Sequence, residues 1–273
     1  MESSPFAREA EGISSALNAG RVEQAALVQL LLKKKIIQPE EFLAEVNELA
    51  SDDYTFSVRR YVTESECELR NGRWHVGGSD ATAALGQALL LGPDDVVLDI
   101  GCGIGGPARQ LAELFGSKVV GVDIRLERVV EAILRTSALG LTSRVSFQPA
   151  EGEHLPFEDD VFDVVISQAT LNRVPDKAGV IREAFRVLKP SGRFGFECEA
   201  ETEKDAAGER ASREPDGLFR ILAWQQLLGA SGFDEIEIEE MWEESRQFYP
   251  SGVERDEIER GERVNVRITA RKP

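Results

Sequence analysis

The stretch that decides the fold is Val96-Val97-Leu98-Asp99-Ile100-Gly101-Cys102-Gly103-Ile104-Gly105-Gly106. Its first five residues are short, apolar and largely β-branched, which is typical of a central parallel strand covered on both faces. Gly101 and Gly103 can adopt backbone angles closed to other residues and leave no Cβ between the chain and a ligand. A helical pattern follows from Pro107, and proline is tolerated in a first helical turn. The stretch predicts a strand, a glycine turn and a helix whose free amides face the carboxyl end of the strand, where open α/β sheets bind ligands.

The glycine turn by itself leaves the ligand open. Its residues fit the pattern G-x-G-x-x-G of dinucleotide-binding proteins, and Asp123 follows at the distance at which such proteins hold a ribose. A redox enzyme that binds NAD and a user of another adenosine cofactor both satisfy this pattern. A tight turn without a ligand is disfavoured because so many glycines stand together. The rest of the chain has to decide between the two cofactor classes.

Beyond this stretch, segments with the pattern of strands alternate with segments with the pattern of helices. Strands are predicted at 96–100, 118–123, 144–148, 162–167 and 193–197, and helices at 126–139 and 180–188. Residues 233–241 and 264–270 alternate apolar with polar side chains, which predicts a closing antiparallel pair. We therefore predict a doubly wound α/β fold with a mostly parallel seven-stranded sheet, a closing antiparallel strand and helices on both faces.

Residues 1–76 do not follow this alternation and are predicted to form a separate N-terminal helical segment, before a main domain at 77–273. Amphipathic helices are predicted within the first 50 residues, and an irregular stretch rich in aromatic side chains follows. A long irregular stretch inside a compact protein is typically functional or mobile. We interpret the segment as a helical pair that packs on the main domain or on a second copy in a homodimer, or as a lid over a substrate.

The composition disfavours several classes of protein. The net charge is −17 and the acids are spread along the chain, whereas binding to nucleic acid needs clustered Lys and Arg. The chain lacks a run of about 18 apolar residues, so no membrane span is predicted. The N-terminus lacks the pattern of a signal peptide, and a cytoplasmic location is expected. The three cysteines are widely spaced, which predicts neither a disulfide framework nor a metal site.

Later segments decide which adenosine cofactor is expected. From about residue 77 onward, the chain resembles the class I S-adenosylmethionine-dependent methyltransferases. The resemblance rests on five segments in the order and at the spacing of that family, which are 97–106, 119–123, 155–157, 162–165 and 187–192. Residues 105–109 are also similar to the branch that methylates sterols, tocopherols and other small molecules. Residues 1–76 lie outside the resemblance.

The resemblance implies that the chain binds S-adenosylmethionine and releases S-adenosylhomocysteine. The residues implied to bind this cofactor are Asp99, Gly101, Cys102, Gly103, Asp123, Ile124, Glu151, Gly152, Ser167 and Gln168. The glycine turn would face the methionine part with Asp99 near its amino group, and Asp123 would hold the ribose. Glu151 stands where many relatives have an Asp that contacts the adenine amino group, and a solvated loop acid is the alternative. Ser167 and Gln168 would flank the methionine side.

Fewer residues define the acceptor side. His75 is the candidate general base, with a packing role as the alternative, and His154 is expected near the adenine without a catalytic role. The candidate residues of the acceptor pocket are Tyr54, Tyr61, Trp74 and Arg173. Glu197 and Glu199, at the end of a predicted strand, are further candidates for contact with a polar acceptor. Ala169 stands where the similar arsenite methyltransferases carry a metalloid-binding cysteine, which argues against arsenite as a substrate.

Together these observations predict a Rossmann-like methyltransferase that transfers a methyl group from S-adenosylmethionine to a small organic molecule. A nicotinamide-dependent oxidoreductase would use the same glycine turn, but it does not explain the later segments. A cofactor-binding protein without catalysis is the other alternative. The acceptor atom is not specified by the sequence.

Overall fold

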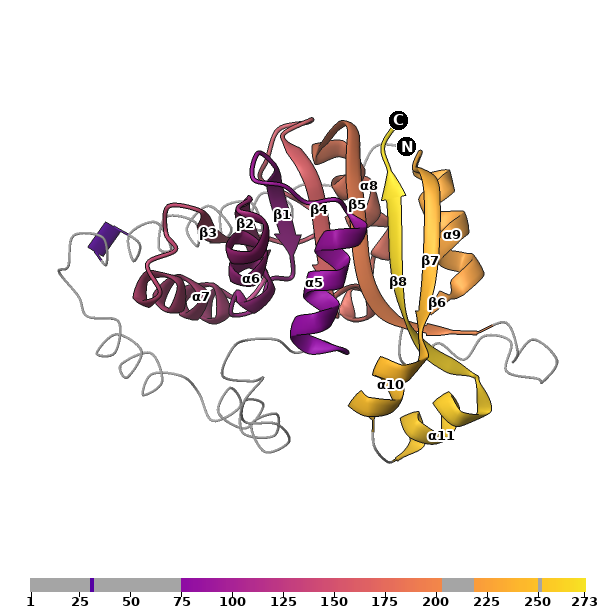
Figure 1. The fold of residues 1–273 in the computed structure, drawn as a ribbon. Coiled ribbons are helices and arrows are strands. Elements are labelled where there is room, and N and C mark those ends of the chain that lie inside the picture. Colours follow the sequence, from indigo (N-terminus) through magenta and orange to yellow (C-terminus); the bar gives the residue numbers. More distant parts are fainter. Residues whose placement is uncertain (1–29, 32–74, 203–218, 250–251) are drawn as a thin grey trace, which may run out of the picture.

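The computed structural model describes residues 30–31, 75–202, 219–249 and 252–273 (Figure 1). These residues form one sheet in the order β3-β2-β1-β4-β5-β8-β7, with β6 paired to β5. The strands are β1 (Val96–Ile100), β2 (Lys118–Asp123), β3 (Val145–Pro149), β4 (Phe162–Gln168), β5 (Leu188–Glu201), β6 (Phe219–Arg220), β7 (Asp234–Met241) and β8 (Arg263–Arg271). Almost all of residues 1–76 lie outside the described residues, among them Tyr54, Tyr61 and Trp74. The predicted boundary between an N-terminal segment and a main domain therefore stays a prediction.

The strand order confirms the predicted doubly wound, Rossmann-like fold. β1 pairs in parallel with β2 on one side and with β4 on the other, and the parallel pairs β2–β3 and β4–β5 extend the sheet. β8 is antiparallel to both β5 and β7, as the alternating pattern predicts. The direction in which the chain adds strands reverses between β1 and β4, and such switch points are where open α/β sheets bind ligands.

Helices cover both faces of the sheet. They are α5 (Gly78–Ala88), α6 (Gly106–Phe115), α7 (Leu126–Ala138), the 3-10 turn η1 (Leu171–Arg173), α8 (Lys177–Val187), α9 (Ile221–Ala230), α10 (Trp242–Phe248) and α11 (Val253–Arg260). α5, α6 and α7 pack on one face, and α8 and α9 pack on the other (Figure 1). β1 serves both faces, because Val97 packs with the first group and Leu98 with the second. None of the described helices is long and apolar enough to cross a membrane.

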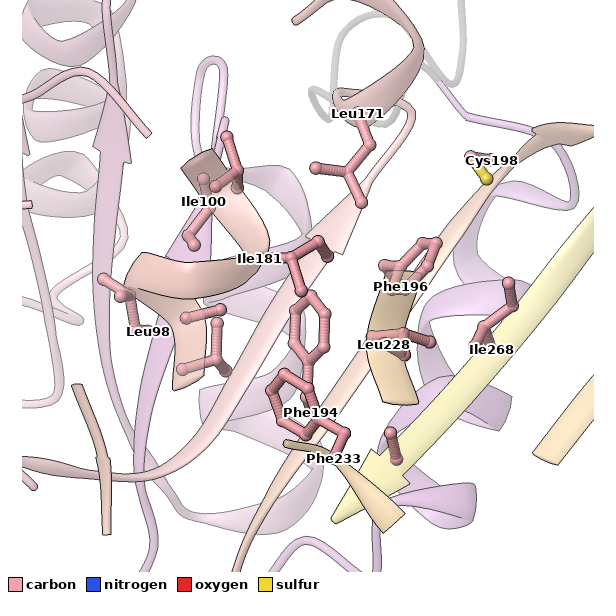
Figure 2. Close-up of a cluster of buried hydrophobic side chains, with 14 of the residues drawn as sticks. Leu98, Ile100, Leu171, Ile181, Phe194, Phe196, Cys198, Leu228, Phe233 and Ile268 are labelled. Atoms are coloured by element: carbon pink, nitrogen blue, oxygen red, sulfur yellow. The ribbon is translucent and has the colours of Figure 1, made fainter. Parts of the chain in front are cut away.

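The core between β5 and the helices α8 and α9 is rich in aromatic side chains (Figure 2). The Phe194 ring stacks against Phe233 with 5.4 Å between the ring centroids, and the Phe196 ring lies 5.0 Å from Trp224. All four side chains are buried, and burying one Phe side chain stabilises a fold by roughly 1.5–3 kcal/mol. This packing holds β5 in place beside β4, whose carboxyl end contributes to the site described below.

β5 differs from its prediction. It spans Leu188–Glu201, whereas the sequence pattern predicts a strand only at 193–197. Its pairing with β4 is irregular between Phe162 and Val164, so the Lys-Pro-Ser-Gly sequence at 189–192 forms an interruption of the ladder rather than a turn before the strand. β6 pairs with the far end of β5 and adds a short eighth strand that the sequence does not predict.

α10 and α11 form a helical insertion between β7 and β8, which the sequence analysis also does not predict. Ser245 anchors α10 to β8, because its hydroxyl donates to the Met241 carbonyl and accepts a 2.9 Å hydrogen bond from the Asn265 amide. At the other end of this helix, the Tyr249 hydroxyl donates to Glu199 of β5. The insertion therefore packs at the carboxyl end of β5, close to the edge of the sheet where the site lies.

Candidate functional site

A cavity lies at the carboxyl ends of β1 and β4, at the switch point of the sheet. It is lined by His75, Asp99, Gly101, Cys102, Gly103, Pro107, Arg128, Gln168, Ala169, Thr170 and Arg173. The structure thus brings seven of the residues predicted for the site together around one cavity. Pro107, Arg128 and Thr170 were missed by sequence reasoning, because Pro107 and Arg128 lie in the first turns of the helices α6 and α7 and Thr170 lies in the loop after β4.

The glycines of the turn lack a side chain for two different structural reasons. Gly101, Gly103 and Gly105 all have positive φ angles, of 78°, 53° and 78°. A Cβ on Gly101 would overlap Thr170, and a Cβ on Gly105 would overlap the Phe147 ring, so these two glycines permit close packing. A Cβ on Gly103 would meet nothing within 4 Å. Of these three glycines, only Gly103 leaves open space of the kind a ligand needs.

Asp99 is an unusually placed acid. It lies on β1 and lines the cavity, it is buried, and its Oδ2 atom has no hydrogen-bond partner among the described residues. Burial, and secondly the charge of Asp123, raise the pKa of the Asp99 carboxyl to about 7. A buried carboxylate oxygen without a partner is costly. Asp99 is therefore suited to a ligand that brings a positively charged donor into the cavity.

Asp123 is the carboxylate that orders the turn. Its Oδ2 atom accepts a 3.0 Å hydrogen bond from the Gly103 amide, and its Oδ1 atom accepts a 2.9 Å hydrogen bond from the Arg125 amide. Arg128 lies 3.9 Å away and balances its charge. Each carboxylate oxygen has two lone pairs, so both atoms keep capacity for a further donor. Ile124, next in the chain, is 54% exposed and places an apolar side chain beside this acid.

Five predicted cofactor residues do not line the cavity, namely Asp123 and Ile124, described above, and Glu151, Gly152 and Ser167. Glu151 and His154 form an isolated β-bridge after β3, with His154 Nδ1 3.6 Å from Glu151 Oε2. A Cβ on Gly152 would meet Ile100, so this glycine permits packing against β1. The Ser167 hydroxyl donates to the Ile100 carbonyl and ties β4 to β1. The predicted roles of Glu151, Gly152 and Ser167 toward a cofactor stay predictions.

On the opposite wall of the cavity, Gln168 connects the site to the interior. Its Nε2 atom donates to Glu197, and its Oε1 atom accepts from the Thr82 hydroxyl of α5, which in turn contacts His75. Glu197 is paired with Arg267 of β8 at 2.8 Å and does not line the cavity. Burial raises the pKa of Glu197 to about 7, although the Arg267 charge acts in the opposite direction.

The predicted acceptor residues are only partly placed. His75 is buried and Arg173 is exposed, and both line the cavity. Glu199 does not line it, because its carboxylate is bound by Tyr249 and by Arg263, the latter at 3.5 Å. The expectation that Glu197 and Glu199 contact an acceptor is therefore not supported by this geometry: both carboxylates are engaged by side chains of the C-terminal strands and helices.

Ala169 shapes the cavity through its backbone. It lines the cavity after the last residue of β4 and has a φ angle of 53°, which is uncommon for a residue with a side chain. Its amide donates to the Glu197 carbonyl at 2.9 Å, so pairing with β5 holds this conformation. Strained backbone of this kind is often found at functional sites. The turn directs the chain away from β4 and toward Thr170, which packs against the glycine turn.

Comparison with known proteins places this site in a family. The sequence model described as "Methyltransferase domain" matches residues 91–229, about half of the chain, and covers β1 to α9. The chain belongs to this family. The predicted family membership is confirmed, and the cavity described above is the cavity of a methyltransferase domain.

Individual relatives agree with this assignment. The chain is 30% identical over 187 residues to phosphoethanolamine N-methyltransferase 1 of Arabidopsis thaliana, and the match covers 67% of this chain and 38% of that protein. It is 33% identical over 178 residues to sarcosine/dimethylglycine N-methyltransferase of Halorhodospira halochloris, covering 63% and 62% of the two chains. The chain thus spans well under half the length of the curated plant phosphoethanolamine enzymes that it matches.

A solved structure shows the same fold. Phosphoethanolamine N-methyltransferase 2 of Haemonchus contortus, in complex with phosphomonomethylethanolamine and S-adenosylhomocysteine, superimposes with a TM-score of 0.63 at 21% identity. The match covers 84% of this chain and 59% of that chain. At this level of identity the similarity concerns the fold, which agrees with the strand order observed here.

Proposed function

We propose that this chain is an S-adenosylmethionine-dependent methyltransferase that methylates a small organic acceptor and releases S-adenosylhomocysteine. The observation that carries the proposal is the buried Asp99 carboxylate, whose Oδ2 atom has no partner among the described residues, beside the open space at Gly103 in a methyltransferase domain. The relatives support the class of acceptor, because their names describe phosphoethanolamine, sarcosine and tocopherol as substrates. All three are small molecules.

The residues present fit this cofactor. Its methionine part carries an ammonium group, which would give the Asp99 carboxylate the charged donor that it lacks. Gly103 lets a ligand approach the backbone closely, because no side chain fills the space beside it. Asp123 holds the turn with two backbone hydrogen bonds and keeps lone pairs for ribose hydroxyls. When bound, the cofactor supplies a methyl group that is already activated on a sulfonium.

The chain itself has to align the acceptor, exclude water and, for a protonated nucleophile, accept a proton. His75 lies in the cavity wall and is our candidate for accepting that proton. Arg173 lies at the cavity on the turn after β4, where its guanidinium suits a carboxylate or phosphate of the acceptor. The roles predicted for Tyr54, Tyr61 and Trp74, the homodimer through the N-terminal helices and the cytoplasmic location stay predictions.

Calorimetric titration with S-adenosylmethionine, S-adenosylhomocysteine and NADH tests the proposal. We expect micromolar affinity for the first two ligands and none for NADH. Binding of NADH alone would support the oxidoreductase alternative, and absence of any binding would contradict the cofactor assignment. Binding without methyl transfer to any member of a broad small-molecule set, followed by mass spectrometry, would favour the non-catalytic alternative.

A pair of matched variants tests the ribose assignment. Asp123→Ala is expected to abolish binding of S-adenosylmethionine while the protein stays folded. Asp163→Ala is the control, since Asp163 also accepts a backbone hydrogen bond, from Val96 at 2.9 Å, but lies at the amino end of β4, away from the glycine turn. We expect the control to keep its affinity within about twofold, a change below one hydrogen bond in free energy. Equal affinities in the two variants would refute the assignment of Asp123.

A further inference from the structure

A row of buried polar side chains leads from the cavity wall into the C-terminal half of the sheet. Its members are His75, Thr82, Gln168, Glu197 and Arg267, which come from the segment before α5, from α5, β4, β5 and β8. Each is at most 7% exposed. Water therefore has little access with which to replace or reverse the hydrogen bonds between them.

Each neighbouring pair in this row is within hydrogen-bond distance. His75 Nε2 lies 2.9 Å from Thr82 Oγ1, and Thr82 Oγ1 lies 3.1 Å from Gln168 Oε1. Gln168 Nε2 lies 2.6 Å from Glu197 Oε2, and Arg267 Nε lies 2.8 Å from Glu197 Oε1. The far end is closed by the Arg267 Nη1 atom, which binds Glu239 at 2.7 Å near the surface.

The Glu197 carboxylate, next to Arg267, sets the direction of the hydrogen bonds that lead from it to His75. An ionised Glu197 only accepts, so the Gln168 amide has to present its NH₂ group to Glu197 and its carbonyl oxygen to Thr82. The single hydroxyl proton of Thr82 then points to Gln168 Oε1 at 3.1 Å, with the Gly78 carbonyl at 3.3 Å as the other acceptor, and the Thr82 oxygen accepts from His75. The Gly78 carbonyl, 2.9 Å from His75 Nε2, is also an acceptor only. Both contacts require the proton of the His75 ring to be on Nε2.

We propose that Gln168, Glu197 and Arg267 are positioning residues that hold neutral His75 in the tautomer with the proton on Nε2, so that Nδ1 is its basic nitrogen. Arg267 keeps Glu197 in the acceptor role, and Gln168 and Thr82 transmit that role across three strands of the sheet and one helix. The use of this nitrogen as a proton acceptor rests on the proposed function. The tautomer itself is a property of the folded chain and can be measured without substrate.

The imidazole ¹⁵N resonances report the tautomer directly. The chain contains two histidines, so His154→Asn leaves His75 as the only signal in the untagged protein. The tautomer is read from a long-range ¹H–¹⁵N correlation spectrum recorded at pH 8.5. This pH is above the pKa of Glu197, which is about 7, so the Glu197 carboxyl is ionised. We expect a protonated Nε2 and an unprotonated Nδ1. A ring protonated on Nδ1, alone or with Nε2, would overturn the proposal.

Glu197→Gln in the same background tests the role of the carboxylate. The new amide can donate to Gln168, which reverses the row and makes Thr82 a donor to His75. We expect the population with the proton on Nδ1 to rise about tenfold, the effect of about one hydrogen bond. Glu239→Gln is the matched control, because Glu239 binds the outer side of Arg267 and is 64% exposed at its side chain. An unchanged ratio in Glu197→Gln, or the same change in the control, would overturn the proposal.

Thr82→Val is a second variant that interrupts the row. If circular dichroism shows that Glu197→Gln is unfolded, Thr82→Val replaces it, since this variant removes the linking hydroxyl without a change of charge. The tautomer ratio should then move toward that of free imidazole, and an unmoved ratio would refute the positioning role. Titration of each variant with S-adenosylmethionine tests the proposed function separately: its failure appears as absent binding in the parent protein, whereas failure of this inference appears only in the tautomer ratio.

Discussion

Asp99→Asn should stabilise the protein without ligand, which is the opposite of the usual effect of changing a buried residue in a central strand. The substitution keeps the size of the side chain and removes the charge that burial makes costly. The Asp99 carboxyl has an ordinary pKa of 3.8 and a pKa of about 7 in the folded protein. The folded state therefore binds this proton more tightly than the unfolded state does.

The magnitude follows from these two pKa values. Each pH unit between them corresponds to about 1.36 kcal/mol, so the ionised Asp99 destabilises the folded state by about 4 kcal/mol once the pH exceeds 7. Near pH 5 the same calculation gives about 2 kcal/mol, and below pH 3.8 the effect disappears. The Asp99 carboxyl thus lowers the stability of the wild-type protein as the pH rises from 4 to 7, and Asp99→Asn does not carry this contribution.

Urea unfolding of both proteins at pH 5 and pH 8, without ligand, measures the difference. We expect Asp99→Asn to be more stable than the wild-type protein, and the difference between their free energies of unfolding to be larger at pH 8 than at pH 5. Asp163→Asn is the control with the opposite sign: hydrogen bonds from Lys189 and the Val96 amide, working against its partial burial, hold the pKa of Asp163 below its ordinary value, so its loss should destabilise the protein at pH 8. If Asp99→Asn is no more stable than the wild-type protein, or if its advantage in the free energy of unfolding becomes smaller as the pH rises, the reasoning is refuted.

Asp99→Asn should also lose affinity for S-adenosylmethionine, because the asparagine amide cannot pair with an ammonium group as the carboxylate does. Calorimetry is expected to show a loss of at least about tenfold, since hydrogen bonds to charged groups contribute about 1.5–3 kcal/mol. Retained affinity would remove Asp99 from the cofactor site. A gain in stability together with a loss of binding is the pattern expected of a residue that serves function at the expense of the fold.

Two further predictions concern the glycine turn and the buried thiols. Gly105→Ala should destabilise the protein more than Gly103→Ala in urea unfolding, because a Cβ at Gly105 would lie 2.4 Å from the Phe147 ring and one at Gly103 meets nothing within 4 Å. Gly103→Ala should instead weaken cofactor binding more than Gly105→Ala does. The reverse order in either measurement would contradict the separate roles of the two glycines. Burial raises the pKa of the Cys102 and Cys198 thiols, so with the third cysteine replaced by serine neither should react with a maleimide at pH 8 until the protein is unfolded. Mass spectrometry after a short exposure checks this, and labelling at the rate of a free thiol would count against the buried positions.

The parts of the fold that follow from local patterns were predictable from sequence. β1, the glycine turn and the acid at the end of β2 are encoded by neighbouring residues, since each strand is an apolar run and each turn has its glycines. The closing strand β8 was predictable because its alternation is local too. β5 was predicted too short, because the Lys-Pro-Ser-Gly sequence at its start is a turn pattern in isolation and only the pairing with β4 incorporates it into a strand.

The connections inside the site were less accessible. Thr82 and Gln168 are 86 positions apart, and Glu197 and Arg267 are 70 apart. Such pairs leave no periodicity in a single sequence, because their contact depends on how α5 and β8 pack against the sheet. The same reason explains why the sequence leaves Glu197 as a candidate for contact with an acceptor: its position at the end of a strand is visible in the sequence, whereas the arginine that binds it is not.

The position of β8 affects how the chain completes its fold during synthesis. β7 precedes β8 in the chain, yet β8 lies between β5 and β7 in the sheet. At about 5–20 residues per second, the ribosome needs a few seconds to add the residues that separate the two strands. During that interval β5 and β7 each present an unpaired edge, and such edges are templates for pairing with another chain.

The sequence of β7 lowers this risk. The strand reads Asp-Glu-Ile-Glu-Ile-Glu-Glu-Met, so two nascent copies would bring carboxylates against carboxylates. β8 carries arginines at 263, 267 and 271, and two of them pair with β7, Arg267 with Glu239 and Arg271 with Glu235. The acidic strand therefore repels a second copy of itself and attracts the strand that completes the sheet, so its charge pattern favours self-completion over aggregation.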